Sequence, residues 1–457
     1  VFVLCYKFTK NVAPAFLGSL FFVVNAVSSG SIVWPASGIA TLPATFFILI
    51  SLITFFEFLK QEKSRWLILS FLSLYVSLFF KETAAPLFFL LPISSLLFVR
   101  YSLKEFTKTF WPFFTLFFIL VGLRFIQFQN ISTSQDLFLT GASKNIPLAL
   151  LTRSFLYPVT SFSLIYIPSE LILPIVKQLT WIYYPFFPPE LYDLVAQTTV
   201  LDMVSVLFSS VILFFLFVLF RSSTRQTKNM VIFVIGFILL SFLPYIIISK
   251  SYSYLESRYY YVSAIGAGLL ISLISVRALQ VFGKRTIIFL FLILIYFFAL
   301  HVKIVKSQIE QQIQFSQERI NILSSITNVK PDLTHKNIFY ITGDRTYYIT
   351  GGNYIPMQQG MGNTLLVWYM GNGSAPKQFL KLISEYYLWE LVGGQGYKEV
   401  DNYGFGYFWD IDKLEKVVKE NKLTKTDIVA FFYNSKEQKI INITDNIVSK
   451  IFENEKK

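Results

Sequence analysis

The chain has 457 residues, of which 54% are hydrophobic and only 15% are charged, and its mean hydropathy is +0.55. Soluble domains carry about 25% charged residues, and a chain of this length has too little interior to bury so many apolar side chains. The composition therefore excludes an ordinary soluble protein. Most of the net charge of +13 lies in residues 1–302, which hold 21 basic and 10 acidic residues.

Cysteine and histidine are scarce. The single cysteine, Cys5, excludes an intramolecular disulfide, and His301 and His335 leave no histidine cluster for a metal. A domain outside the membrane without cysteine favours a bacterial cell envelope. The sequence begins at Val1, and its first residues resemble the end of an earlier apolar helix. We therefore expect it to be N-terminally truncated.

Runs of about 17 to 21 apolar residues recur along the first two-thirds of the chain, which is the length that crosses a hydrocarbon core of about 30 Å. We therefore expect an α-helical polytopic membrane protein, with residues 1–302 as its transmembrane domain. This domain is expected to contain about nine helices, at 12–28, 39–59, 66–80, 84–99, 109–127, 200–220, 229–248, 260–277 and 286–302.

The orientation follows from lysine and arginine, which accumulate in cytoplasmic loops. Alternate short connections hold 14 basic residues, beginning with Lys7 and Lys10 and ending with Lys284 and Arg285. Nine crossings then place the C-terminal residues outside a bacterial inner membrane. The positive charge is explained by this topology, so it gives no ground for a nucleic-acid partner.

The long outer connection, about residues 128–199, mixes apolar stretches with prolines and aromatic residues. Aromatic rings with polar edges favour the headgroup level of a bilayer. We expect interfacial or re-entrant helices at 146–166 and 171–187, although two extra crossings would preserve the same topology. Such helices would frame a cavity for a lipid-linked substrate or simply seal the bundle.

The remaining residues have the pattern of a soluble α/β domain. Residues 303–330 predict a linker helix, and residues 331–457 predict a small extracytoplasmic domain. Asp410 and Thr444 stand where helix N-caps belong. Its glycine pairs fit turns better than phosphate-binding loops. The expected strands are Ile338–Thr342, Leu365–Met370, Phe405–Trp409, Ile428–Tyr433 and Lys439–Ile443, and the expected helices are Gln378–Leu391, Lys413–Asn421 and Asp445–Phe452.

Two charged segments on the outer side need an explanation, because charges near a bilayer are costly. Lys81 and Glu82 lie between two apolar runs and predict the tip of a helical hairpin. Arg258 lies among tyrosines just before the helix at 260–277. Two interpretations stay open for each segment. Lys81 and Glu82 are a mutually neutralising interfacial pair and Arg258 is a snorkelling arginine, or both segments belong to a site in which cations bind a phosphate.

A resemblance to the GT-C membrane glycosyltransferases, which include the protein O-mannosyltransferases, is carried by two segments: Ser77–Pro86 (SLFFKETAAP) and Glu256–Gly266 (ESRYYYVSAIG). The first is similar to the family's Lys-Glu-Thr hairpin and the second to its Glu-Arg-Tyr-x-Tyr-x-Pro-x-x-Gly segment. The resemblance covers about residues 10–300. It implies transfer of a sugar, hexosyl or mannosyl, from a polyprenyl-phosphate donor to an unknown acceptor outside the membrane.

The resemblance also implies roles for individual residues. Lys81 and Arg258 would bind the donor phosphate, Glu82 or Glu256 would be the supporting acids, and Tyr259 and Tyr261 would contact sugar or lipid. Outside the two matching segments, Arg153 of the outer connection would be a third, weaker cation for the phosphate. The family's principal aspartate is expected upstream of Val1. The resemblance allows a divalent metal, but no ligand set or other cofactor is evident in the sequence.

The sequence departs from the family in one outer loop, where Asn25 and Gly30 stand in the places of a histidine and a glutamate. Two other functions therefore stay open. A non-catalytic scaffold or receptor would use the outer domain to bind a partner. A lipid or solute transporter would show internal repeats and charges at mid-membrane, and the sequence has neither feature.

Overall fold

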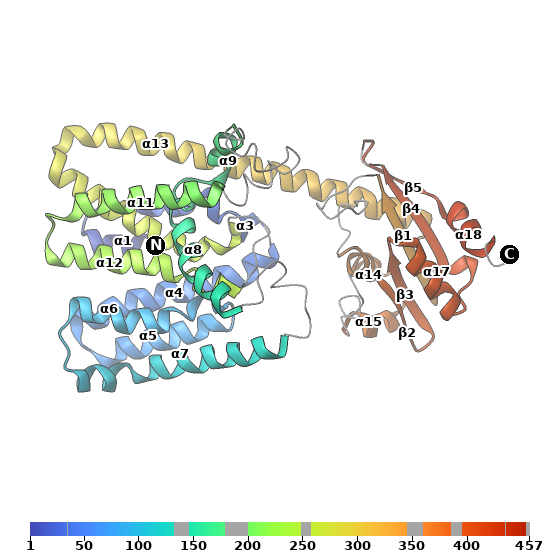
Figure 1. The fold of residues 1–457 in the computed structure, drawn as a ribbon, viewed down its shortest axis with the longest axis horizontal. Coiled ribbons are helices and arrows are strands. Elements are labelled where there is room, and N and C mark those ends of the chain that lie inside the picture. Colours follow the sequence, from blue (N-terminus) through green and yellow to red (C-terminus); the bar gives the residue numbers. More distant parts are fainter. Residues whose placement is uncertain are drawn as a thin grey trace. The chain divides into compact units, whose positions relative to one another are not determined.

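The computed structural model describes residues 1–33, 35–131, 146–178, 200–247, 257–344, 360–384, 395–434 and 436–453. The chain divides into two compact units, Val1–Ile309 and Glu310–Lys457. The first unit is helical and the second contains the sheet (Figure 1). This division confirms a helical part followed by a small α/β part.

The described part of the first unit consists of helices. Its α-helices are α1 (Phe2–Thr9), α2 (Val12–Val24), α3 (Gly30–Val33), α4 (Pro35–Gln61), α5 (Ser64–Leu78), α6 (Leu87–Phe98), α7 (Leu103–Ile131), α8 (Ile146–Leu164), α9 (Ser169–Gln178), α11 (Leu201–Phe220), α12 (Arg225–Leu240) and the first part of α13 (Tyr261–Val329). Short 3-10 turns are η1 (Ala26–Ser28), η2 (Glu82–Ala84), η6 (Leu243–Ile247) and η7 (Ser257–Tyr259).

Among the described residues, five helices are long and apolar enough to cross a membrane: Ser37–Gln61, Leu103–Leu123, Leu201–Phe220, Arg225–Ile246 and Tyr261–Gly283. Three further apolar helices, at Val12–Val24, Ser64–Leu78 and Glu82–Phe98, are shorter. Large apolar side chains such as Phe214 and Phe217 are more than two-thirds exposed, which suits a lipid environment. The crossing of a membrane by nine helices stays a prediction.

The helix that begins at Tyr261 forms the centre of the first unit. Within its apolar span 72% of the residues are buried, compared with 22% in α11 and 17% in α7. The helix breaks at Gly283, where φ is +72°, a conformation that glycine adopts without steric cost. Beyond this break it continues to Val329, so the predicted span 286–302 and the predicted linker 303–330 belong to one helix.

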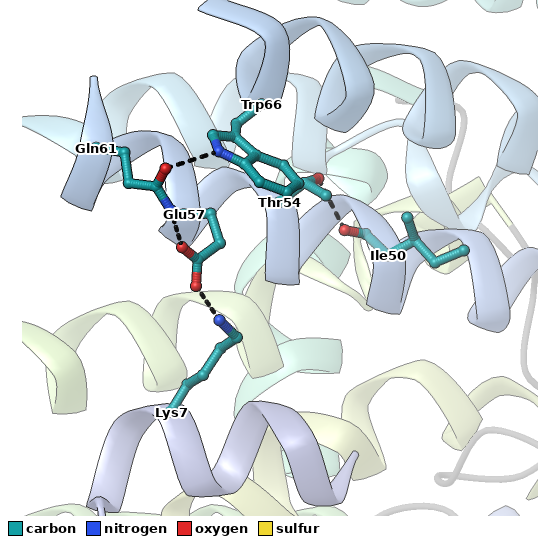
Figure 2. A network of polar contacts seen from close by, with 6 residues as sticks. All are labelled: Lys7, Ile50, Thr54, Glu57, Gln61 and Trp66. Carbon is teal, nitrogen blue, oxygen red and sulfur yellow. Dashed lines mark hydrogen bonds and ion pairs between the residues drawn. The ribbon is translucent and has the colours of Figure 1, made fainter. Parts of the chain in front are cut away.

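Two basic residues near helix ends contact neighbouring helices. Figure 2 shows Lys7 of α1 paired with Glu57 of α4, which also accepts a hydrogen bond of 2.6 Å from Gln61. Arg277 of α13 donates to the carbonyl of Leu219 at the end of α11. The predicted grouping of all five basic connections on one side of a membrane stays a prediction.

The outer segment contains a sharp bend. The axes of α8 and α9 differ by 100°, so the two helices do not form one straight span. The first matches the helix predicted at 146–166. The second covers the beginning of the helix predicted at 171–187, of which residues 179–187 lie outside the described residues, as do 132–145 and 188–199.

The second unit is a five-stranded sheet with helices on both faces. Its strands lie in the order β2-β3-β1-β4-β5, and the central strand β1 is parallel to both of its neighbours. The outer strands are antiparallel. The strands are β1 (Lys336–Gly343), β2 (Gly396–Val400), β3 (Tyr403–Phe408), β4 (Ile428–Asn434) and β5 (Lys439–Asn442), and the helices are α14 (Met361–Gly371), α15 (Leu380–Ser384), α17 (Ile411–Glu420) and α18 (Thr444–Glu453).

Alternating side chains of β1 build two separate cores. Phe339 and Ile341 pack with α14 and the end of α13, whereas Ile338 and Tyr340 pack with α17 and α18. Figure 1 shows α14 and α15 on one face of the sheet and α17 and α18 on the other. Successive side chains of a strand point to opposite faces of the sheet, so β1 is buried on both faces.

One predicted element of this unit is wrong and another was missed. The predicted strand at Leu365–Met370 is part of the helix α14. Its buried residues Met361, Leu365, Leu366 and Tyr369 follow helical spacing, so burial of one helix face decides the structure against the apparent strand composition. The strand β2 was not predicted. The described part of the predicted helix Gln378–Leu391 is short, and residues 385–391 lie outside the described residues.

Candidate functional site

Lys81 lies at the tip of the hairpin between α5 and α6, as predicted. Its Nζ donates a hydrogen bond of 2.8 Å to Oγ1 of Thr41, near the beginning of α4. The same nitrogen lies 5.8 Å from the centre of the Tyr259 ring, within the range of a cation–π interaction. Lys81 is half-buried, and α4 and η7 each contribute one contact to its ammonium group.

Arg258 belongs to the short turn η7 before α13. Its Cζ lies 4.9 Å from the centre of the neighbouring Tyr259 ring, and its carbonyl accepts a hydrogen bond of 2.9 Å from Oγ of Ser31. Because both cations lie close to one ring, the distances limit their separation to less than about 11 Å. The structure therefore brings together two cations that are far apart in the sequence.

Burial dominates the electrostatics of Lys81. It lowers the pKa of the Lys81 ammonium to about 8; the positive charge of Arg258 adds to this shift, while the negative charge of Glu82 opposes it. The ammonium is therefore still mostly protonated at pH 7. An anion placed between the two cations would favour the charged form further.

Tyr259 has an aromatic neighbour that sequence reasoning did not single out. Its ring centre lies 4.3 Å from that of Tyr245, a buried residue of η6. The ring of Tyr261 packs edge-on against Phe22 of α2, with ring centres 5.3 Å apart. Of the two predicted tyrosines, Tyr259 thus lies at the cations and Tyr261 stabilises helix packing.

The remaining predicted residues are placed differently. Arg153 of α8 donates from Nη1 to the carbonyl of Ile246 at 3.4 Å, so its guanidinium contacts the backbone of η6. Glu82 follows Lys81 and is exposed. Glu256 lies outside the described residues. No group of three or more histidine, cysteine, aspartate or glutamate side chains suited to a metal occurs among the residues that the structure describes.

The structure adds Thr41 and Ser31 to this candidate site. Both are almost completely buried, and each directs its hydroxyl at a group of the cation pair. In the sequence they are hydroxyl residues next to apolar runs, which are common in membrane helices because such hydroxyls bond to the backbone. Only their pairing with distant cations distinguishes them, and that pairing requires the fold.

Comparison with known proteins gives no relative, since no family model, no curated protein and no solved structure matches this chain. The geometry around Tyr259 is consequently the basis for a functional assignment.

Proposed function

We propose that this protein is a membrane glycosyltransferase that moves a sugar from a polyprenyl-phosphate donor to an acceptor at the outer membrane face. The observation that carries the proposal is the pair of Lys81 and Arg258 on one aromatic ring. Two cations in a partly shielded position bind a phosphate more strongly than either does alone. The arginine fork also fits two phosphate oxygens at once.

The reaction would need a base and a stabilised leaving group. A carboxylate removes the proton of the acceptor hydroxyl, and the oxygen forms a bond to the anomeric carbon of the sugar. The bond between that carbon and the phosphate oxygen breaks, and polyprenyl phosphate leaves with the electron pair. Lys81 and Arg258 would stabilise its negative charge. Glu82 is the described carboxylate nearest to Lys81 in sequence, and it is our candidate for the base.

The proposal also fixes a side of the membrane. Thr41, which accepts the hydrogen bond from Lys81, lies 16 residues before Glu57 in α4. This separation is about 24 Å along a helix. We assign the Glu57 end of α4 to the cytoplasm on the positive-inside rule. The cation pair and the C-terminal unit would then lie outside an inner membrane.

The test is a transfer assay with the full protein in membranes, using radiolabelled polyprenyl-phosphate mannose and polyprenyl-phosphate glucose as donors. Arg258→Ala should lower kcat/KM by about 100-fold or more, because a charged donor to phosphate is lost. Arg258→Lys should recover only part of the activity, because a single ammonium cannot replace the bidentate fork.

The matched control is Arg65→Ala. Arg65 also lies over an aromatic ring, with its Cζ 5.2 Å from the centre of Trp66, but it is in the first turn of α5, whereas Lys81 follows the last residue of that helix. Its removal should leave transfer unchanged. Normal transfer by Arg258→Ala, or an equal loss in Arg65→Ala, would remove the cation pair from the mechanism.

A non-catalytic scaffold is the second candidate, and one observation favours it. Asn25, which replaces a histidine of the GT-C pattern, is buried and uses its amide internally. Nδ2 donates to the carbonyl of Ile165 at 2.9 Å, and Oδ1 accepts from the amide of Val27 at 3.0 Å. A wild-type protein that binds polyprenyl phosphate but transfers no sugar from either donor would support the scaffold.

A further inference from the structure

His301 of α13 is completely buried and bridges two backbone groups. Its Nδ1 lies 3.0 Å from the amide nitrogen of Ala26, and its Nε2 lies 3.1 Å from the carbonyl oxygen of Tyr166. An amide N–H only donates and a carbonyl only accepts. Nδ1 must therefore be the acceptor and Nε2 must carry the proton, so the ring is neutral in this arrangement.

The bridge ties η1 to the turn that follows α8. Asn25 makes a second bond between the same two segments, from Nδ2 to the carbonyl of Ile165. Phe21 and Phe297 pack edge-on against the imidazole, with ring centres at 5.6 Å and 4.6 Å. The ring orientation is therefore fixed by packing as well as by hydrogen bonds.

The anchored segment leads directly to Arg258. The helix α3 follows η1 within two residues, and from it Ser31 donates its hydroxyl to the carbonyl of Arg258. On the other side, the hydroxyl of Tyr260 lies 3.2 Å from Oγ of Ser161 in α8. The turn that carries Arg258 is thus bonded to two segments, η1–α3 and α8, and His301 connects these two segments to each other.

We propose that His301 is a positioning residue for the cation pair, which holds residues 25–33 so that Arg258 is aligned for a polyprenyl phosphate. The identity of the ligand, a polyprenyl phosphate, rests on the proposed function. The anchoring of residues 25–33 by His301 does not depend on it. His301 lies outside the predicted phosphate contacts and acts through η1 and Ser31. Loss of the bridge should weaken donor binding more than it slows the chemical step.

The experiment compares His301→Leu with His301→Gln in the full protein reconstituted in nanodiscs. A glutamine amide offers one acceptor and one donor in place of the two ring nitrogens, whereas leucine offers neither. Hydrogen exchange of the amides in residues 26–33 reports the anchoring without any activity. The Leu variant should exchange about tenfold faster there, as expected when one buried hydrogen bond is lost, and the Gln variant should restore most of the protection.

The second measurement is the KM for polyprenyl-phosphate mannose. It should rise about tenfold in the Leu variant with kcat within about threefold, whereas a general folding defect would lower kcat and leave KM unchanged. Phe298→Leu is the packing control, because Phe298 is buried beside the same Phe21 ring; it should alter neither measurement.

Unchanged exchange in His301→Leu, or faster exchange without a higher KM, would overturn the inference. If the wild type transfers no sugar, the proposed function fails, and the exchange data still decide whether His301 anchors the segment.

Discussion

At the scale of single residues, the site was predictable where a charge stands among apolar neighbours. Lys81 and Arg258 were identified because a cation beside a bilayer requires a compensating partner. Their convergence on the Tyr259 ring agrees with that reasoning, whereas their role in binding phosphate stays a prediction. Thr41, Ser31 and Tyr245 could not be predicted, because hydroxyl groups and aromatic rings in apolar runs have many ordinary packing roles.

The buried position of Lys81 predicts a pH dependence for donor binding. Its pKa is lowered to about 8 by burial, so the ammonium is charged below this pH and loses its charge as the pH rises through it. The KM for a polyprenyl-phosphate sugar should therefore increase about tenfold between pH 7 and pH 9.

The matched variant for this prediction is Lys81→Arg, whose guanidinium stays protonated over the whole range. Its KM should be nearly constant between pH 7 and pH 9, even if it is higher overall. An increase with pH in the arginine variant as large as in the wild type would show that another group titrates.

At the scale of elements, a close helix crossing holds the centre of the first unit together. Gly18 of α2 meets Gly268 of α13, and a Cβ added at Gly18 would overlap the Gly268 carbonyl oxygen. Beside this crossing, Oγ of Ser272 donates to the carbonyl of Pro14 at 2.9 Å. Small residues that allow two backbones to approach are a common basis of helix association in membranes.

Gly18→Ala should consequently destabilise the first unit. The added methyl must displace backbone atoms, which costs about 1–3 kcal/mol for overpacking, and the thermal midpoint in detergent should fall by about 3–8 °C. Gly122→Ala in α7 is the control, because a Cβ there has no atom within 4 Å. A fall in midpoint of equal size in both variants would contradict the close crossing.

The elements themselves were predictable to different degrees. Apolar runs fix the positions of helices, because few other structures satisfy the backbone inside a bilayer. The strands β1, β3, β4 and β5 also matched their predictions, and Asp410 caps α17 by accepting from the amides of Asp412 and Lys413. The strand predicted at Leu365–Met370 was wrong. The composition of this segment suits a strand, but the burial of one face of α14 against the sheet makes it a helix.

At the scale of the whole molecule, the distribution of charge predicts the topology. Lys7 pairs with Glu57 near the end of α4, and Arg277 contacts the carbonyl of Leu219 near the end of α11. Thr41, which binds Lys81, lies 16 residues before Glu57 in α4. Alkaline phosphatase fused to the C-terminal unit should therefore be active, and the same enzyme inserted in the connection 221–224 should be inactive. The reverse pattern would contradict the orientation and with it the placement of the site.

The position of a bound donor tests the central claim most directly, because it concerns the phosphate itself. The measurement is a cryo-electron microscopy structure of the full protein in a nanodisc with a polyprenyl-phosphate mannose analogue. The account predicts that the phosphorus atom lies within about 5 Å of both Nζ of Lys81 and Cζ of Arg258, which is the range of charge-assisted hydrogen bonds. A phosphate bound elsewhere, with the two cations unchanged in their contacts to Tyr259, would contradict the account.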